Sequence, residues 1–134
     1  MNAELWIQAA DYSTPVKTSV DSASEAIRHF DSFDWLSALK MGLDRSARDE
    51  DHCPVGMGVV RDDATIIHVC PAPDMNLSVV WHSPFKRKFW GIFRKRIEPF
   101  ETVGLSRNDL DKILRLFLNR QDAALAEVLK VETP

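Results

Sequence analysis

Five side chains that can bind zinc fall within a 31-residue stretch, namely His52, Cys53, His68, Cys70 and His82. Zinc sites use such ligands in pairs two to four residues apart, so that both reach one ion. His68 and Cys70 have a suitable spacing for a strand, but Cys53 precedes a proline and has no second cysteine nearby. The pattern favours a small buried Cys70 and a hydrogen-bonded His68 over a zinc site. We predict no metal and no other cofactor.

Residues suited to catalysis are equally sparse. The chain has no Gly-x-Ser-x-Gly nucleophile turn, and Gly56 and Gly58 lack the third glycine and the helix of a nucleotide-binding loop. They are better explained as positions where neighbouring segments approach closely. Asp62 and Asp63 are adjacent in a turn, where they should point apart and face water rather than act as an acid–base pair. No catalytic residue is predicted, and an enzyme is the least supported class.

A basic aromatic run is the strongest candidate for binding. Residues 86–96 (KRKFWGIFRKR) carry six positive charges and no negative one, whereas the whole chain has 17 basic and 20 acidic residues. Without the run, 11 basic and 20 acidic residues remain, a balance of −9. Such polarity orients encounters with a charged partner. We predict a binding strip made of Lys86, Arg87, Lys88, Trp90, Arg94, Lys95 and Arg96. The alternative is an edge strand whose lysines prevent aggregation.

A second candidate contact is the acidic group Asp49, Glu50 and Asp51, in the polar segment 44–52. A solvated loop explains it more simply, because loop charges are common and cost little.

Composition indicates one globular domain over residues 1–134. Apolar residues make up 45% and charged residues 28%, and no stretch approaches the roughly 20 apolar residues that span a bilayer. The first residues lack the basic and apolar regions of a secretion signal. Two cysteines do not suggest a disulfide framework, so we expect a reducing, cytoplasmic environment.

Helices are expected in three places. Ser22 and Glu25 form a capping box before an apolar face, and a second helical stretch starts near Trp35 and stops within 44–52. Ser106 and Asp109 begin the strongest amphipathic helix, which is followed by a break near Gln121 and renewed helical signal. Six aromatic residues are assigned to the core: Trp6, Phe30, Phe33, Trp35, Phe100 and Phe117.

Strands are expected elsewhere. One or two short strands lie within 4–17, and residues 55–60, 65–70 and 77–81 form an antiparallel meander, because their short turns leave no room for parallel crossovers. A two-residue loop at Asp62 and Asp63 would pair Val59 with Ile66. Residues 85–96 fit either a strand or a helix, with a strand favoured. The predicted class is α+β, an antiparallel meander of about four to five strands packed by an N-terminal helical segment and a C-terminal amphipathic helix.

This order of elements resembles small immunity proteins of bacterial polymorphic and contact-dependent toxin systems. The resemblance rests on the segments SASEAIRHF, LSVVWHS and GLSRNDLDKILRLFLNR, and on a strand followed by a helix with Ser106, Asp109, Phe117 and Arg120 in the family's pattern. It implies a protein-binding inhibitor that occludes the active site of a cognate toxin domain. The basic run departs from the acidic character of many immunity proteins against nucleases.

Two other readings of the basic run remain open. A nucleic-acid or anionic-surface binder would use the same strip, with bases stacked on its aromatic side chains. The −9 balance elsewhere opposes tight polyanion binding. A helical run would instead favour attachment to a membrane surface.

Overall fold

The computed structural model describes residues 3–9, 16–50, 55–82 and 100–129. Residues 83–99, which contain the basic aromatic run, lie outside the described residues, as do Asp51, His52 and Cys53. The predicted binding strip and the strand-or-helix alternative for 85–96 therefore stay predictions. In the described part of the chain, no helix is both long and apolar enough to cross a membrane.

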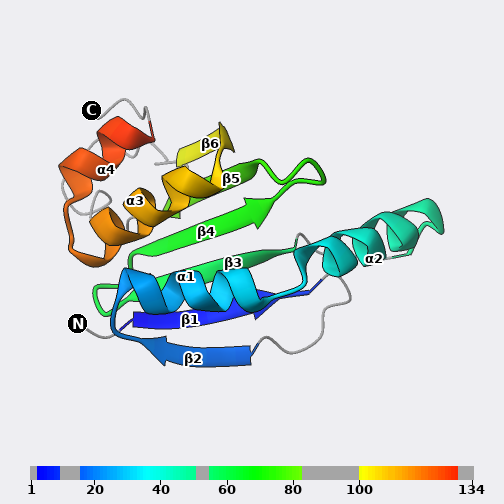
Figure 1. Cartoon of the computed structure of the whole chain (residues 1–134), viewed down its shortest axis with the longest axis horizontal. Coiled ribbons are helices and arrows are strands. Elements are labelled where there is room, and N and C mark those ends of the chain that lie inside the picture. Colours follow the sequence, from blue (N-terminus) through cyan, green and yellow to red (C-terminus); the bar gives the residue numbers. More distant parts are fainter. Residues whose placement is uncertain (1–2, 10–15, 51–54, 83–99, 130–134) are drawn as a thin grey trace, which may run out of the picture.

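A six-stranded antiparallel sheet forms the centre of the fold, so the predicted α+β class is confirmed with a slightly higher strand count. The strands are β1 (Ala3–Gln8), β2 (Val16–Val20), β3 (Gly56–Arg61), β4 (Ile66–Pro71), β5 (Leu77–His82) and β6 (Phe100–Leu105). Their spatial order is β2-β1-β3-β4-β5-β6. The predicted meander of β3, β4 and β5 is confirmed (Figure 1).

Four helices accompany the sheet: α1 (Ala23–Ser32), α2 (Trp35–Ala47), α3 (Arg107–Leu118) and α4 (Asp122–Val128). Figure 1 shows α1 and α3 on the same side of the sheet. Helix α1 packs against α3, and α3 against α4. The Thr102 hydroxyl of β6 donates a 2.6 Å hydrogen bond to the carbonyl of Leu129, just beyond α4. The core therefore lies between one face of the sheet and these three helices.

The helix starts follow the predicted capping chemistry. Ser106 and Asp109 form a complete capping box. Ser22 accepts a hydrogen bond from the Glu25 backbone N–H, but the Glu25 carboxylate accepts from Asp21 rather than from Ser22. Helix α1 buries the expected face, which consists of Ala23, Ala26, Ile27 and Phe30.

The β3–β4 hairpin differs from the predicted register by one residue. Val59 pairs with Ile67, not with Ile66, because the loop contains Ala64 as a third residue. Ala64 has a φ of 66°, and its N–H donates to the Arg61 carbonyl at 3.0 Å. A residue in the left-handed region commonly closes three-residue hairpin loops. The shift reverses the faces of β4: Ile67 and Val69 enter the core, whereas His68 points to the opposite face.

Trp6 also differs from its prediction as a core residue. Along β1, Ala3 and Leu5 are buried in the core, whereas Trp6 is half-buried and alternates to the other face. Phe30, Trp35 and Phe117 are buried as expected, and Phe33 is partly buried against the same core.

Candidate functional site: a groove at the start of helix α2

The described part of the acidic candidate lies at the far end of α2. Asp49 and Glu50 are exposed, and Asp49 has a φ of 55°. Glu50 forms ion pairs with Arg45 at 3.6 Å and with Arg48 at 3.2 Å. The helix ends at Ala47, within the polar segment 44–52 as predicted, and residues 44–47 of that segment are helical rather than part of a loop. Two of the three acidic residues therefore lie just beyond the C-terminal end of the helix that carries the apolar side chains described below.

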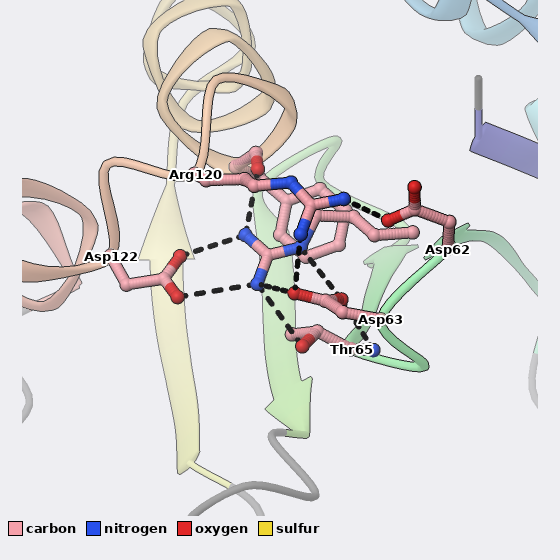
Figure 2. Close-up of polar contacts among 7 residues, drawn as sticks. Asp62, Asp63, Thr65, Arg120 and Asp122 are labelled. Carbon is pink, nitrogen blue, oxygen red and sulfur yellow. Dashed lines mark hydrogen bonds and ion pairs between the residues drawn. The ribbon is translucent and has the colours of Figure 1, made fainter. Parts of the chain in front are cut away.

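Arg61 is the centre of a buried polar cluster that joins the β3–β4 loop to the junction of α3 and α4. Its side chain is only 2% exposed. The guanidinium donates to both Asp63 carboxylate oxygens at 3.1 and 2.8 Å, to the Thr65 hydroxyl at 3.1 Å and to Asp122 at 2.8 and 3.2 Å (Figure 2). It also donates to the Phe117 carbonyl at 2.9 Å. Asp63 is thus not the water-facing turn residue that we predicted.

A second arginine closes the cluster from its exposed side. Arg120 forms ion pairs with Asp62 and, at 3.3 Å, with Asp63 (Figure 2). Burial works against ionisation of Asp63, but hydrogen bonds from Arg61 and Thr65 outweigh it and hold the pKa of this carboxyl below its usual value. The cluster therefore carries paired charges at neutral pH.

The Arg61 cluster is a structural clamp rather than a ligand site. A guanidinium has five N–H groups and no acceptor. The Arg61 Nε and both terminal nitrogens already donate to the acceptors named above, so none of the three is left to hold a ligand. The cluster fixes the β3–β4 loop against the α3–α4 junction.

The sheet face opposite the helices carries an aromatic group. The rings of Trp6 and His68 meet edge to face with centroids 5.4 Å apart, and those of His68 and His82 lie 5.7 Å apart. A Cβ atom at Gly58 would lie 2.1 to 2.6 Å from atoms of the Trp6 indole, so this glycine makes room for the indole. Burial and the proximity of His82 lower the pKa of His68.

The zinc hypothesis gains no geometric support from this face. Among the described residues, no three metal-ligating side chains converge. His68 and Cys70 do point to the same face, as expected, and both are half-buried. The His68 ring meets the rings of Trp6 and His82 edge to face.

Helix α2 exposes an unusual amount of apolar surface. Leu36 is 63% exposed, Leu43 58% and Met41 41%. Leu36, Leu39 and Leu43 have the i, i+3, i+7 spacing that places side chains along one helical stripe. Only Trp35 and Ala38 of this helix are fully buried. Figure 1 shows α2 extending past the strands. Exposed clusters of large apolar side chains mark interaction surfaces.

A groove of about 310 Å³ lies where α2 begins. We define it by its lining: Phe30, Asp31, Phe33, Asp34, Trp35, Leu36, Met75, Leu77 and Arg107. Six of these nine side chains are apolar. Met75, in the β4–β5 turn, is 40% exposed with a φ of 66°. The groove brings together the end of α1, the start of α2, one sheet turn and the start of α3.

Local contacts hold the groove in shape. The Trp35 indole N–H donates a 2.7 Å hydrogen bond to the Phe30 carbonyl, and the Trp35 ring lies 4.5 Å from that of Phe33. Asp34 caps α2 by accepting from the Ser37 backbone N–H and hydroxyl at 3.1 and 2.7 Å. These contacts fix the side chains that form the floor and one rim.

Charge on the rim is mainly negative. Arg107 donates to both carboxylate oxygens of Asp31, at 2.8 and 2.6 Å, and these hydrogen bonds lower the pKa of Asp31. Hydrogen bonds from Ser37 lower the pKa of Asp34. Both carboxylates are therefore ionised at neutral pH, and in the described part of the lining Arg107 is the one cation that balances them.

Sequence reasoning placed α2 correctly but missed the groove. In the sequence, Leu36 and Leu43 look like ordinary core residues of an amphipathic helix. The neighbouring residues do not indicate that the sheet is too short to cover these two side chains. Met75 and Arg107 are remote from Leu36 in sequence and meet it only in the fold. Comparison with known protein families, curated proteins and solved structures finds no match to this chain.

Proposed function

We propose that this protein is a non-enzymatic protein-binding module, and specifically an immunity protein that neutralises a cognate bacterial toxin domain by covering its active site. The observation that carries the proposal is the exposed apolar surface of α2, where Leu36 and Leu43 are more than half exposed. Water-exposed leucines at helical spacing become stabilising when a partner covers them. The groove at the start of α2 adds a concave contact.

The described chemistry suits inhibition by occlusion rather than catalysis. The clamped Arg61 cluster and the bonded Trp35 hold the framework rigid, so that little conformational entropy is lost on docking. An apolar centre with charged residues around it is the arrangement that gives slow dissociation and fast, oriented association. The acidic residues Asp49 and Glu50 and the basic run 86–96 are the further contacts that we propose.

Co-expression tests the proposal. If an adjacent upstream gene encodes a large secreted protein, its C-terminal domain is expressed in bacteria with and without this chain. We expect the domain alone to arrest growth, and this chain to restore growth and to co-purify with the domain. A toxin domain from an unrelated locus is the control, and it should be neither neutralised nor bound.

The opposing outcome is equally definite. Growth arrest that persists despite good expression of this chain, together with separate elution of the two proteins, would exclude the immunity role. Salt-sensitive binding to a polynucleotide in that same preparation would favour the nucleic-acid alternative.

A further inference from the structure

We infer that the groove at the start of α2 receives a partner segment in which an apolar side chain lies next to lysine or arginine. This inference rests on the proposed protein-binding function and names the chemistry of the partner. It follows from the apolar floor of the groove, the charge of its rim and the net charge of the described residues.

The apolar floor of the groove favours an apolar side chain of the partner as the anchor. Phe30, Phe33, Trp35 and Leu77 supply its inner apolar surface, and Leu36 and Met75 stand exposed on its rim. The volume of about 310 Å³ admits an inserted side chain rather than a flat contact. Anchors of interfaces occupy such preformed pockets, where water is expelled from both surfaces. Met75 also adapts readily to the shape of a guest, because its side chain is flexible and polarisable.

The charge of the rim favours a lysine or arginine of the partner beside that anchor. Asp31 and Asp34 line the groove, and Asp74 precedes Met75 in the same turn. Among the described residues that line the groove, Arg107 is the one cation, and Asp31 binds it through two hydrogen bonds. Asp34 uses its oxygens to cap α2 but keeps its negative charge. A lysine or arginine of a partner would restore the balance at this rim.

The charges of the described residues as a whole have the same sign. The described residues include 10 lysines and arginines and 16 aspartates and glutamates, a balance of −6. A negative surface attracts a basic partner over a distance of about a Debye length, roughly 10 Å at 0.1 M salt. An acidic segment would meet repulsion both in the approach and at the rim. Charge complementarity therefore favours a basic partner segment.

Peptide selection tests this inference without the toxin. The full chain is immobilised and used to select from a phage-displayed library of random peptides. We expect enrichment of peptides with Leu, Phe or Met beside Lys or Arg. A selected peptide and a version with its Lys and Arg changed to Glu are then synthesised, and binding of both to the full chain is measured. The Glu version should bind at least about tenfold more weakly.

Three variants and two controls locate the binding. Leu36→Gln and Met75→Gln remove apolar contact at exposed positions, and each should weaken peptide binding about tenfold at any salt concentration. Val80→Gln is the control for an apolar position, because Val80 is half-buried on the sheet face opposite the helices and does not line the groove, and this variant should bind normally. Asp34→Asn removes a charge but keeps a good helix cap. It should weaken binding about threefold to tenfold, and this loss should shrink in about 0.5 M salt. Glu127→Gln on α4 is its control.

The outcomes separate this inference from the proposed function. Enrichment of acidic peptides, or peptide binding that Leu36→Gln and Met75→Gln leave unchanged, would overturn the groove assignment even if the chain neutralises a toxin. Basic apolar peptides that bind in the groove would support the assignment even if no toxin is neutralised. Circular dichroism and thermal unfolding of each variant confirm that it is folded.

Discussion

The guanidinium of Arg61 lies 4.9 Å from the centroid of the Phe117 ring, and the same group donates a 2.9 Å hydrogen bond to the Phe117 carbonyl. Strand β3 is thereby joined to the last turn of α3, and Asp63 and Asp122 neutralise the buried charge from two sides. A charge in this position is stable only while its partners stay in place.

Replacing Arg61 by methionine should therefore destabilise the protein strongly. The methionine keeps an unbranched apolar stem but leaves Asp63, whose side chain is 14% exposed, without its main cation. Removing one member of a buried pair costs about 3 kcal/mol or more. Urea unfolding at neutral pH measures the change. Arg115→Met is the control, because its pair with Asp111 is exposed and should contribute about 0.5 kcal/mol or less.

Gly58→Ala should disturb the Trp6 side chain. The added methyl group would lie 2.1 to 2.6 Å from the indole, so the ring must move, at a cost of about 1–3 kcal/mol. In a Trp6→Ala background, the same change should cost clearly less. A double-mutant cycle of unfolding free energies measures this coupling. If the unfolding free-energy changes of the two substitutions are additive, the Trp6 indole does not restrict the side chain at position 58.

Ala64→Gly should stabilise the β3–β4 hairpin. Ala64 has a φ of 66°, a conformation that costs an L-residue about 1–2 kcal/mol, whereas glycine adopts it freely. Greater freedom of the unfolded chain offsets part of the gain, so we expect a net increase of about 0.5–1 kcal/mol. Thermal unfolding measures it. Ala124→Gly in helix α4 is the matched change and should have the opposite sign.

His68 should make stability depend on pH. Burial and His82 lower its pKa in the folded protein. Between that lowered pKa and about 6.5, the unfolded state binds more protons, so stability rises with pH. Acidification from neutral pH through this window should therefore destabilise the wild type more than His68→Gln. Denaturant unfolding at several pH values tests this, and parallel stability profiles for the two proteins would contradict it.

Short-range patterns predicted much of the fold. The cap at Ser106 with Asp109 is a contact between residues three apart, and the structure forms it as expected. The strand predicted over 77–81 is likewise formed, and the apolar residues that alternate along it, Leu77, Val79 and Trp81, are its buried side. Both signals depend on the geometry of one helix or one strand, which the neighbouring residues already determine.

The hairpin register was beyond such reasoning. Asp62 and Asp63 indicate a turn, but whether Ala64 belongs to the loop depends on its backbone conformation. Alanine carries no preference for the left-handed region. The burial of Ile67 and the ion pair of Asp63 with Arg120 favour the three-residue loop, and both are long-range effects.

The sequence alone determines the antiparallel strands, the capped helices and the polarised charge. Hydrophobic period, capping and charge are properties of neighbouring residues. Only the tertiary structure decides that Arg61 meets Asp122, that Trp6 lies over Gly58 and that Leu36 stays exposed beside Met75. These relationships depend on how far the sheet extends and on where each helix ends relative to the strands. Packing of the whole chain sets those limits, and no short segment contains them.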